Sequence, residues 1–122
     1  MILVVFRARA HMDVVEESSA IGEELKALAQ SMPGFVDYKE FAADDGEFVT
    51  IVMFEDAESL RAWREHPRHR EAIRLGYERW LSSYDICVCE VERRYTRDDR
   101  AKAVTAGAPV PGSVPVWDRT AT

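Results

Sequence analysis

The segment at residues 47–54 constrains the fold most, because it is apolar on both sides. Read as a strand, Phe48-Val-Thr-Ile-Val-Met-Phe54 places large apolar side chains on each face of a sheet. A sheet with helices on one face and water on the other should instead alternate apolar with polar residues. We therefore expect helices to cover one face of this sheet and a second copy of the chain to cover the other.

Apolar runs and turn signals predict the order strand, helix, strand, strand, helix, strand. The turn signals are Pro33-Gly34 and Asp44-Asp45-Gly46, and Pro67 predicts a break in the second helical segment near His66. The expected strands are 2–11, 35–43, 47–54 and 85–95, and the expected helices are 13–32, 56–65 and 67–82. This order repeats a split β-α-β unit. It predicts an α+β, ferredoxin-like fold with a four-stranded antiparallel sheet and helices on one face.

Composition and charge exclude several classes of partner. The chain of 122 residues has 16 basic and 22 acidic residues, and the resulting net charge of −6 argues against nucleic-acid binding. The apolar N-terminal run is too short to span a membrane and lacks the features of a signal peptide, so we expect no membrane association and a cytoplasmic location. Cys87 and Cys89 are expected to be small buried residues with reduced thiols.

Residues 1–96 form the predicted domain, and the character of the sequence changes after them. Residues 97–122 are rich in proline, glycine and alanine and show no periodicity. Such a segment is either an extended arm or a disordered tail. Trp117 is the residue in it that would dock on a neighbouring subunit.

Rings recur at helical spacing in residues 63–80, and they are the main functional signal. Residues spaced by three and four share one helix face, and here they are Trp63, His66, His69, Ile73, Tyr77 (or Gly76) and Trp80. Flat rings mixed with imidazoles favour a pocket for a flat aromatic ligand. We predict His69 as the general base and His66 as the second choice. The alternatives are a hydrogen-bonded structural role for His69 and a helix-cap role for His66.

Five residues are predicted to contact the substrate. Trp63, Tyr77 and Trp80 would stack against its ring, unless they only fill the core. Tyr84 would donate a hydrogen bond, or else it anchors the turn before the last strand. Arg7 would stabilise an anion, or else it pairs with an acidic neighbour. The arginines of the second helical segment alternate with glutamates, which predicts a solvated surface of ion pairs.

Several motifs of the second half together match one known family. They are Phe54-Glu-Asp-Ala-Glu-Ser-Leu60-Arg-Ala-Trp63, His66-Pro67-Arg-His69, Gly76, Trp80, Tyr84 and Glu90-Val-Glu-Arg93. With these motifs, residues 1–96 resemble the antibiotic biosynthesis monooxygenase family. The resemblance implies a ferredoxin-like domain that dimerises through its sheet into a dimeric α/β barrel. The family's activities include cofactor-free oxygenation of phenolic polyketides, haem degradation and small-molecule signalling.

The haem-degrading members of that family carry features that this chain lacks. They have an asparagine on the first strand and a histidine ligand nine or ten residues after the helical tryptophan. Trp63 matches the tryptophan, but Ala72 and Ile73 stand at the histidine positions, and Phe6-Arg7-Ala8 offers no asparagine. We therefore predict O2-dependent oxidation of a phenolic molecule by a homodimer without a cofactor or metal. The alternatives are haem binding or degradation, with His66 or His69 as ligand, and a non-catalytic small-molecule-binding dimer.

Overall fold

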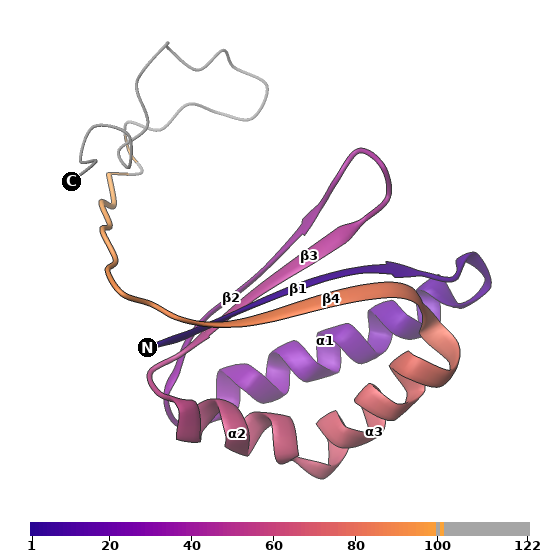
Figure 1. The fold of residues 1–122 in the computed structure, drawn as a ribbon, viewed down its shortest axis with the longest axis horizontal. Helices are drawn as coiled ribbons and strands as arrows, with labels where there is room; N and C mark the ends of the chain where they lie inside the picture. Colours follow the sequence, from indigo (N-terminus) through magenta and orange to yellow (C-terminus); the bar gives the residue numbers. More distant parts are fainter. Residues whose placement is uncertain (100, 102–122) are drawn as a thin grey trace.

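The computed structural model describes residues 1–99 and 101 as one sheet covered by helices on one side (Figure 1). Along the chain the elements are β1 (Ile2–Ala10), the 3-10 turn η1 (Met12–Val14), α1 (Val15–Ser31), β2 (Phe35–Ala42), β3 (Phe48–Phe54), α2 (Ala57–Glu65), α3 (Pro67–Leu75), the π-helical turn η2 (Gly76–Trp80) and β4 (Leu81–Glu90). The strand order is β2-β3-β1-β4, and all neighbours are antiparallel. The predicted ferredoxin-like α+β fold is confirmed.

The break between α2 and α3 follows from local chemistry. Asp56 caps α2 by accepting a hydrogen bond from the Ser59 N–H at 2.8 Å. The residue before a proline avoids the helical conformation, and His66 has φ −57° and ψ 134°. Pro67 then begins α3, where its missing N–H leaves no hydrogen bond unmade. The break predicted near His66 is confirmed.

The last helix and the last strand differ from the prediction. The helix expected to run to residue 82 gives way after Leu75 to η2, and β4 begins at Leu81 instead of residue 85. β4 starts early because residues 81–84 pair with the end of β1, across a register shift between Arg9 and Ala10. It ends at Glu90 instead of residue 95, because Glu90 already pairs with Ile2, the first residue of β1.

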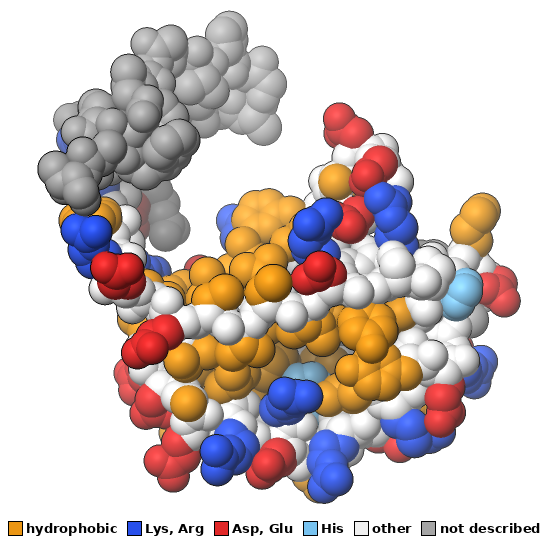
Figure 2. Space-filling view, in the orientation of Figure 1, with side chains coloured by type: hydrophobic (Ala, Val, Ile, Leu, Met, Phe, Trp, Pro, Cys, Tyr) orange, Lys and Arg blue, Asp and Glu red, His pale blue; other side chains and the backbone are white. Residues whose placement is uncertain are grey.

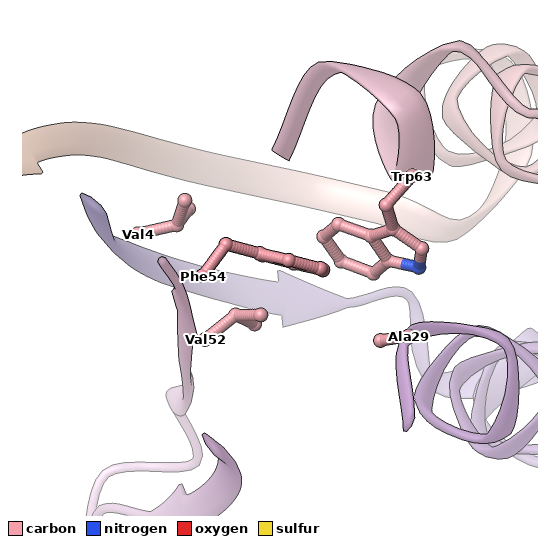
Figure 3. Close-up of a cluster of buried hydrophobic side chains, with 5 residues drawn as sticks. All are labelled: Val4, Ala29, Val52, Phe54 and Trp63. Atoms are coloured by element: carbon pink, nitrogen blue, oxygen red, sulfur yellow. The ribbon is translucent and has the colours of Figure 1, made fainter. Parts of the chain in front are cut away.

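The core lies between the centre of the sheet and the first two helices. Figure 3 shows its five fully packed side chains, which come from β1, α1, β3 and α2: Val4, Ala29, Val52, Phe54 and Trp63. The rings of Phe54 and Trp63 pack with centroids 5.7 Å apart. The Trp63 Nε1–H also donates to the Leu25 carbonyl at 3.2 Å, which ties α2 to α1.

The other face of the sheet carries no helix (Figure 1). Side chains of alternate residues point to it, since their strand neighbours Val4 and Val52 face the helices. This outer face carries Leu3, Val5, Arg7, Phe41, Val49, Ile51, Cys87 and Cys89. Both thiols are exposed in the single chain. The prediction that they are buried is therefore wrong for the isolated chain.

Residues 91–99 form no helix or strand. The predicted tail from residue 97 lies almost wholly outside the described residues, and Trp117 with it. The division into a domain and a tail stays a prediction. Within the described part of the chain, no helix is long and apolar enough to cross a membrane.

Candidate functional site

An apolar groove runs along the helix-facing side of β4. Tyr84, Ile86 and Val88 pair with Ala8, Phe6 and Val4, so they face the same side of the sheet as the buried Val4 and Ala8. Yet Tyr84 is 50%, Ile86 46% and Val88 56% exposed. Figure 2 shows an apolar band between β4 and the helices. We call this band, with Tyr77 at its helical side, the β4 groove.

Two stacked tyrosines form the aromatic part of the β4 groove. The rings of Tyr77 and Tyr84 lie with centroids 4.9 Å apart and planes at 30°. Both rings are about half exposed and offer flat apolar surface to a planar ligand. The pKa of Tyr77 is raised, first by burial and then by the neighbouring Tyr84. Both predicted tyrosines therefore meet at one place.

The π-helical turn explains why Tyr77 is outside the core. In η2 the hydrogen bonds span five residues, which changes the face that each side chain occupies. Gly76 and Trp80 are buried, whereas Tyr77 is exposed. The structure therefore separates Tyr77 from Trp80, and Gly76, the alternative member of the predicted stripe, is the residue buried with Trp80.

The two tryptophans are core residues in this structure. Trp63 is 7% and Trp80 4% exposed. Trp63 packs in the core cluster, as described above. The Nε1 of Trp80 is buried and has no hydrogen-bond partner. Among the described residues, it is the one buried side-chain nitrogen or oxygen without such a partner. Neither indole presents a face to the groove, so stacking on a ligand would fall to Tyr77 and Tyr84.

His69 is held against Trp63 in a defined tautomer. Its ring centroid lies 4.1 Å from that of Trp63, and its Nδ1 lies 3.2 Å from the Trp63 carbonyl oxygen. A carbonyl only accepts hydrogen bonds, so Nδ1 carries the hydrogen and Nε2 keeps its lone pair. Burial lowers the pKa of His69 to about 4, with smaller lowering by Arg64 and His66. His69 is therefore a neutral acceptor at physiological pH.

His66 has the opposite arrangement. Its Nδ1 accepts a hydrogen bond from the Arg68 N–H at 3.1 Å and so caps α3. In the neutral ring the hydrogen then sits on Nε2, and no lone pair is left for a ligand or a proton. The helix-cap alternative for His66 fits this geometry better than the role of a base.

Arg7 lies on the outer face of the sheet, away from the β4 groove. Its guanidinium forms a 2.8 Å ion pair with Glu47, and this carboxylate raises the pKa of Arg7. Of the predicted site residues, the structure thus brings together Tyr77 and Tyr84, and it places His69 two helical turns before Tyr77. It does not bring Arg7, Trp63 or Trp80 to the groove surface.

Sequence reasoning missed Ile86 and Val88. Both follow Tyr84 at intervals of two residues along β4, so their side chains lie on the same face of the sheet as Tyr84. That face is the signal that could have found them. The sequence also predicts ion pairs along the whole series of helical arginines. Arg68, Arg74 and Arg79 do form ion pairs, but Arg61, Arg64 and Arg70 form none with the described residues.

Comparisons with known proteins agree with the fold. The model of the antibiotic biosynthesis monooxygenase family matches residues 1–75 of the 122. The chain belongs to the antibiotic biosynthesis monooxygenase family. YqjZ of Bacillus subtilis (strain 168), described as uncharacterized, is 29% identical over 72 residues, which are 59% of this chain and 63% of that protein. This chain thus matches less than two thirds of the length of that relative.

Solved structures share the architecture at low identity. Rv0793 from Mycobacterium tuberculosis has a TM-score of 0.70 and 16% identity, with 78% of this chain and 98% of the other covered. SnoaB from Streptomyces nogalater, described as a cofactor-independent oxygenase, has a TM-score of 0.65 and 17% identity, with 79% and 97% covered. Identities this low show the fold alone. The family match ends at Leu75, so Tyr77 and the β4 residues lie beyond it.

Proposed function

We propose that the protein is a monooxygenase that oxidises an aromatic, phenolic small molecule with O2 and uses no resident cofactor. The observation that carries this proposal is the β4 groove, in which two stacked tyrosines and an uncovered apolar strand lie beside a helix with a neutral imidazole. A flat ligand would cover apolar surface that the fold leaves in water, and each covered square ångström contributes about 25 cal/mol. Membership of the family and the likeness to SnoaB support the reaction type.

The proposed reaction balances without an added reductant. A CH2 group flanked by phenol rings reacts with O2 to give a carbonyl, and the second oxygen atom leaves with the two hydrogens as water. The electrons come from the substrate, which must first be made electron-rich by loss of a proton. The protein would contribute orientation and removal of water from the reacting carbon.

The basicity of His69 limits its role. Phenols have a pKa near 10, and His69 has a pKa of about 4. Complete proton transfer from such a phenol to His69 would be unfavourable by about a millionfold. His69 would therefore act mainly by accepting a hydrogen bond at Nε2, which orients the substrate and withdraws its proton as the anion develops.

Oxygen consumption with an anthrone as substrate tests the proposal. We expect protein-dependent O2 uptake above a protein-free blank, with the quinone product followed by absorbance. Replacing His69 by alanine should lower turnover about 100-fold. The control is His11→Ala, which removes an exposed imidazole at the end of β1. An unchanged rate in the His69 variant would remove His69 from the mechanism.

Binding without O2 uptake would identify the protein as a non-catalytic small-molecule-binding dimer. The burial of both tryptophans favours this non-catalytic function, because the β4 groove then offers a ligand less aromatic surface than the sequence predicts. Saturable quenching of tyrosine fluorescence by the anthrone under nitrogen would measure that binding. Loss of quenching in Tyr84→Ala would place the ligand in the β4 groove.

Haem binding is the remaining alternative, and the tautomer of His69 favours it. Haem iron takes a neutral imidazole, and His69 keeps a free lone pair on Nε2 while its Nδ1 is held by the Trp63 carbonyl. Haem would supply iron as the site of O2 activation. A 1:1 shift of the Soret band on addition of haemin should disappear in His69→Ala and persist in His66→Ala. No shift in the native protein would rule this alternative out.

We also propose that the outer face of the sheet joins two copies of the chain. Leu3, Val5 and Ile51 lie side by side there, and Phe41 is 49% exposed. Light scattering should give twice the 13.9 kDa mass of one chain. Val5→Glu, between Ile51 and Cys87, should give the single mass. Ala27→Glu, on the exposed side of α1, is the matched control and should stay dimeric.

A further inference from the structure

We propose that a hollow between α2 and α3 binds an anionic group of the aromatic ligand, so that the substrate is an aromatic carboxylate or an acidic phenolate. The hollow has a volume of about 300 Å3 and is lined by Arg64, Glu65, Arg70 and Ile73. We call it the α2–α3 hollow. The inference rests on the proposed β4 groove for the position of the ring, and the hollow supplies what the groove lacks, a charge.

The charges of the α2–α3 hollow are unusual for this chain. The protein carries a net charge of −6, and Arg68, Arg74 and Arg79 of the same helical segment each pair with a glutamate. Arg64 and Arg70 form no ion pair with any described residue, and Glu65 is not within ion-pair distance of either. Two arginines thus line one hollow together with a single glutamate. Guanidinium groups bind carboxylates through paired hydrogen bonds, so an anion fits this place.

The α2–α3 hollow and the β4 groove lie within reach of one ligand. Ile73 lines the hollow and stands four residues before Tyr77, so about one helical turn of α3 and η2 separates the hollow from the groove. The positive charge of Arg64 contributes to the lowered pKa of His69, and it opposes the rise in the pKa of Tyr77. A ring stacked on Tyr77 and Tyr84 would therefore direct an acidic substituent toward Arg64 and Arg70.

An anionic ligand also resolves the weak basicity of His69. A substrate that arrives ionised does not need to give a full proton to an imidazole with a pKa of about 4. Arg64 and Arg70 would hold its negative charge, and the Nε2 of His69 would accept a hydrogen bond from a second hydroxyl on the ring. The two features of the site then have separate roles: charge recognition and orientation.

A pair of probes with the same ring separates charge from stacking. We would titrate the full-length protein with 2-naphthoate and with 2-naphthamide and follow backbone amide shifts by NMR. The anion should bind about tenfold more tightly at low salt, a typical effect of a charged hydrogen bond at a partly exposed site. The advantage should shrink as salt is added.

Single substitutions then locate the charge. Arg64→Gln and Arg70→Gln should each reduce the preference for 2-naphthoate and leave 2-naphthamide binding unchanged. Arg61→Gln is the matched control, because Arg61 is an exposed and unpaired residue of α2 that does not line the hollow. It should keep the full preference. Circular dichroism of each variant checks that the fold is intact.

The outcomes distinguish this inference from the proposed groove. Equal affinity for the two probes, or a preference unaffected by both substitutions, would overturn the anion site and leave the groove standing. If neither probe binds, the groove fails, and inorganic phosphate becomes the probe of the α2–α3 hollow alone. Shifts of the Arg64 and Arg70 Nε–H signals with phosphate would support the hollow, and their absence would reject it.

Discussion

Two parts of the same sheet face have opposite environments. At its centre, Val52 and Phe54 of β3 are fully buried under α1 and α2, whereas Ile86 and Val88 of β4 are half exposed. Both strands place apolar side chains toward the helical layer with the same alternation. The two strands differ in the helices that pack on them. β3 packs against α2, whereas the main helical neighbour of β4 is the short turn η2. Apolar residues that the fold does not cover are those available to a ligand.

The strongest test of this contrast compares one ring from each part. Trp63→Ala removes a buried indole from the core and leaves the Leu25 carbonyl without its donor. We expect the free energy of unfolding to fall by about 3–5 kcal/mol, as for other large-to-small core substitutions. Tyr84→Ala removes a half-exposed ring and should lower it by less than about 1 kcal/mol. Urea unfolding followed by far-UV circular dichroism measures both.

For ligand binding we expect the opposite order: the change at Tyr84 should have a larger effect than a change at Trp63. Tyr84→Ala should weaken the binding of 2-naphthamide, while Trp63→Phe, a milder change in the core, should leave it close to native. Equal losses of stability in Tyr84→Ala and Trp63→Ala would show that the groove is part of the core. The contrast between the two parts would then disappear.

The pH dependence of stability tests His69, which lies between the two parts. Its pKa is about 4 in the folded protein, below the ordinary value of 6.5. Between these values the unfolded chain binds the proton more readily, so the stabilising contribution is complete above pH 6.5 and is lost as the pH falls toward 4. Because the ring is partly exposed, we expect a loss of about 1–2 kcal/mol.

Urea unfolding at pH 7 and pH 4.5 measures this loss. His69→Phe keeps a ring against Trp63 and removes the titration, so its stability should change less over the same interval. The His11→Ala variant, which loses only an exposed ring, is the control and should behave as the native protein does. A native-like loss in His69→Phe would assign the effect to other groups.

The smallest predicted effect concerns His66, which caps α3, the helix that carries His69. Replacing it by alanine removes the acceptor of the Arg68 N–H, and we expect a loss of about 0.5–1 kcal/mol in unfolding free energy. Asparagine is a good helix cap and should restore the native value. Thermal unfolding of both variants measures this. Reduced ligand binding in His66→Asn, with native stability, would instead give His66 a functional role.

The order of elements could be predicted because its signals are local. Gly34 and Gly46 have φ of 82° and 91°, and each stands in a turn that the sequence marks. Asp56 and Pro67 likewise begin helices through contacts with their own neighbours in the chain. Such short-range chemistry can be recognised without knowing the tertiary structure.

The site could be predicted only in part, because it depends on contacts between distant segments. Helical spacing and ring type predict Tyr77 and His69 as site residues, and the position of Tyr84 before the last strand predicts it as a third. Whether Trp63 faces a ligand or the core depends on α1, whose Leu25 carbonyl accepts its hydrogen bond. The exposure of Ile86 and Val88 depends on the absence of a helix over β4. No periodicity of residues 63–80 contains that information.

The π-helical turn has a consequence for the stacked tyrosines of the β4 groove. A five-residue hydrogen-bonded turn holds one more residue than an α-helical turn in the same place. Deleting one residue between Gly76 and Trp80 would therefore restore a regular helix and rotate the preceding side chains by about 100° relative to β4. Tyr77 would part from Tyr84. A single-residue deletion, which changes none of the remaining residues of the chain, would thus remove the aromatic part of the β4 groove.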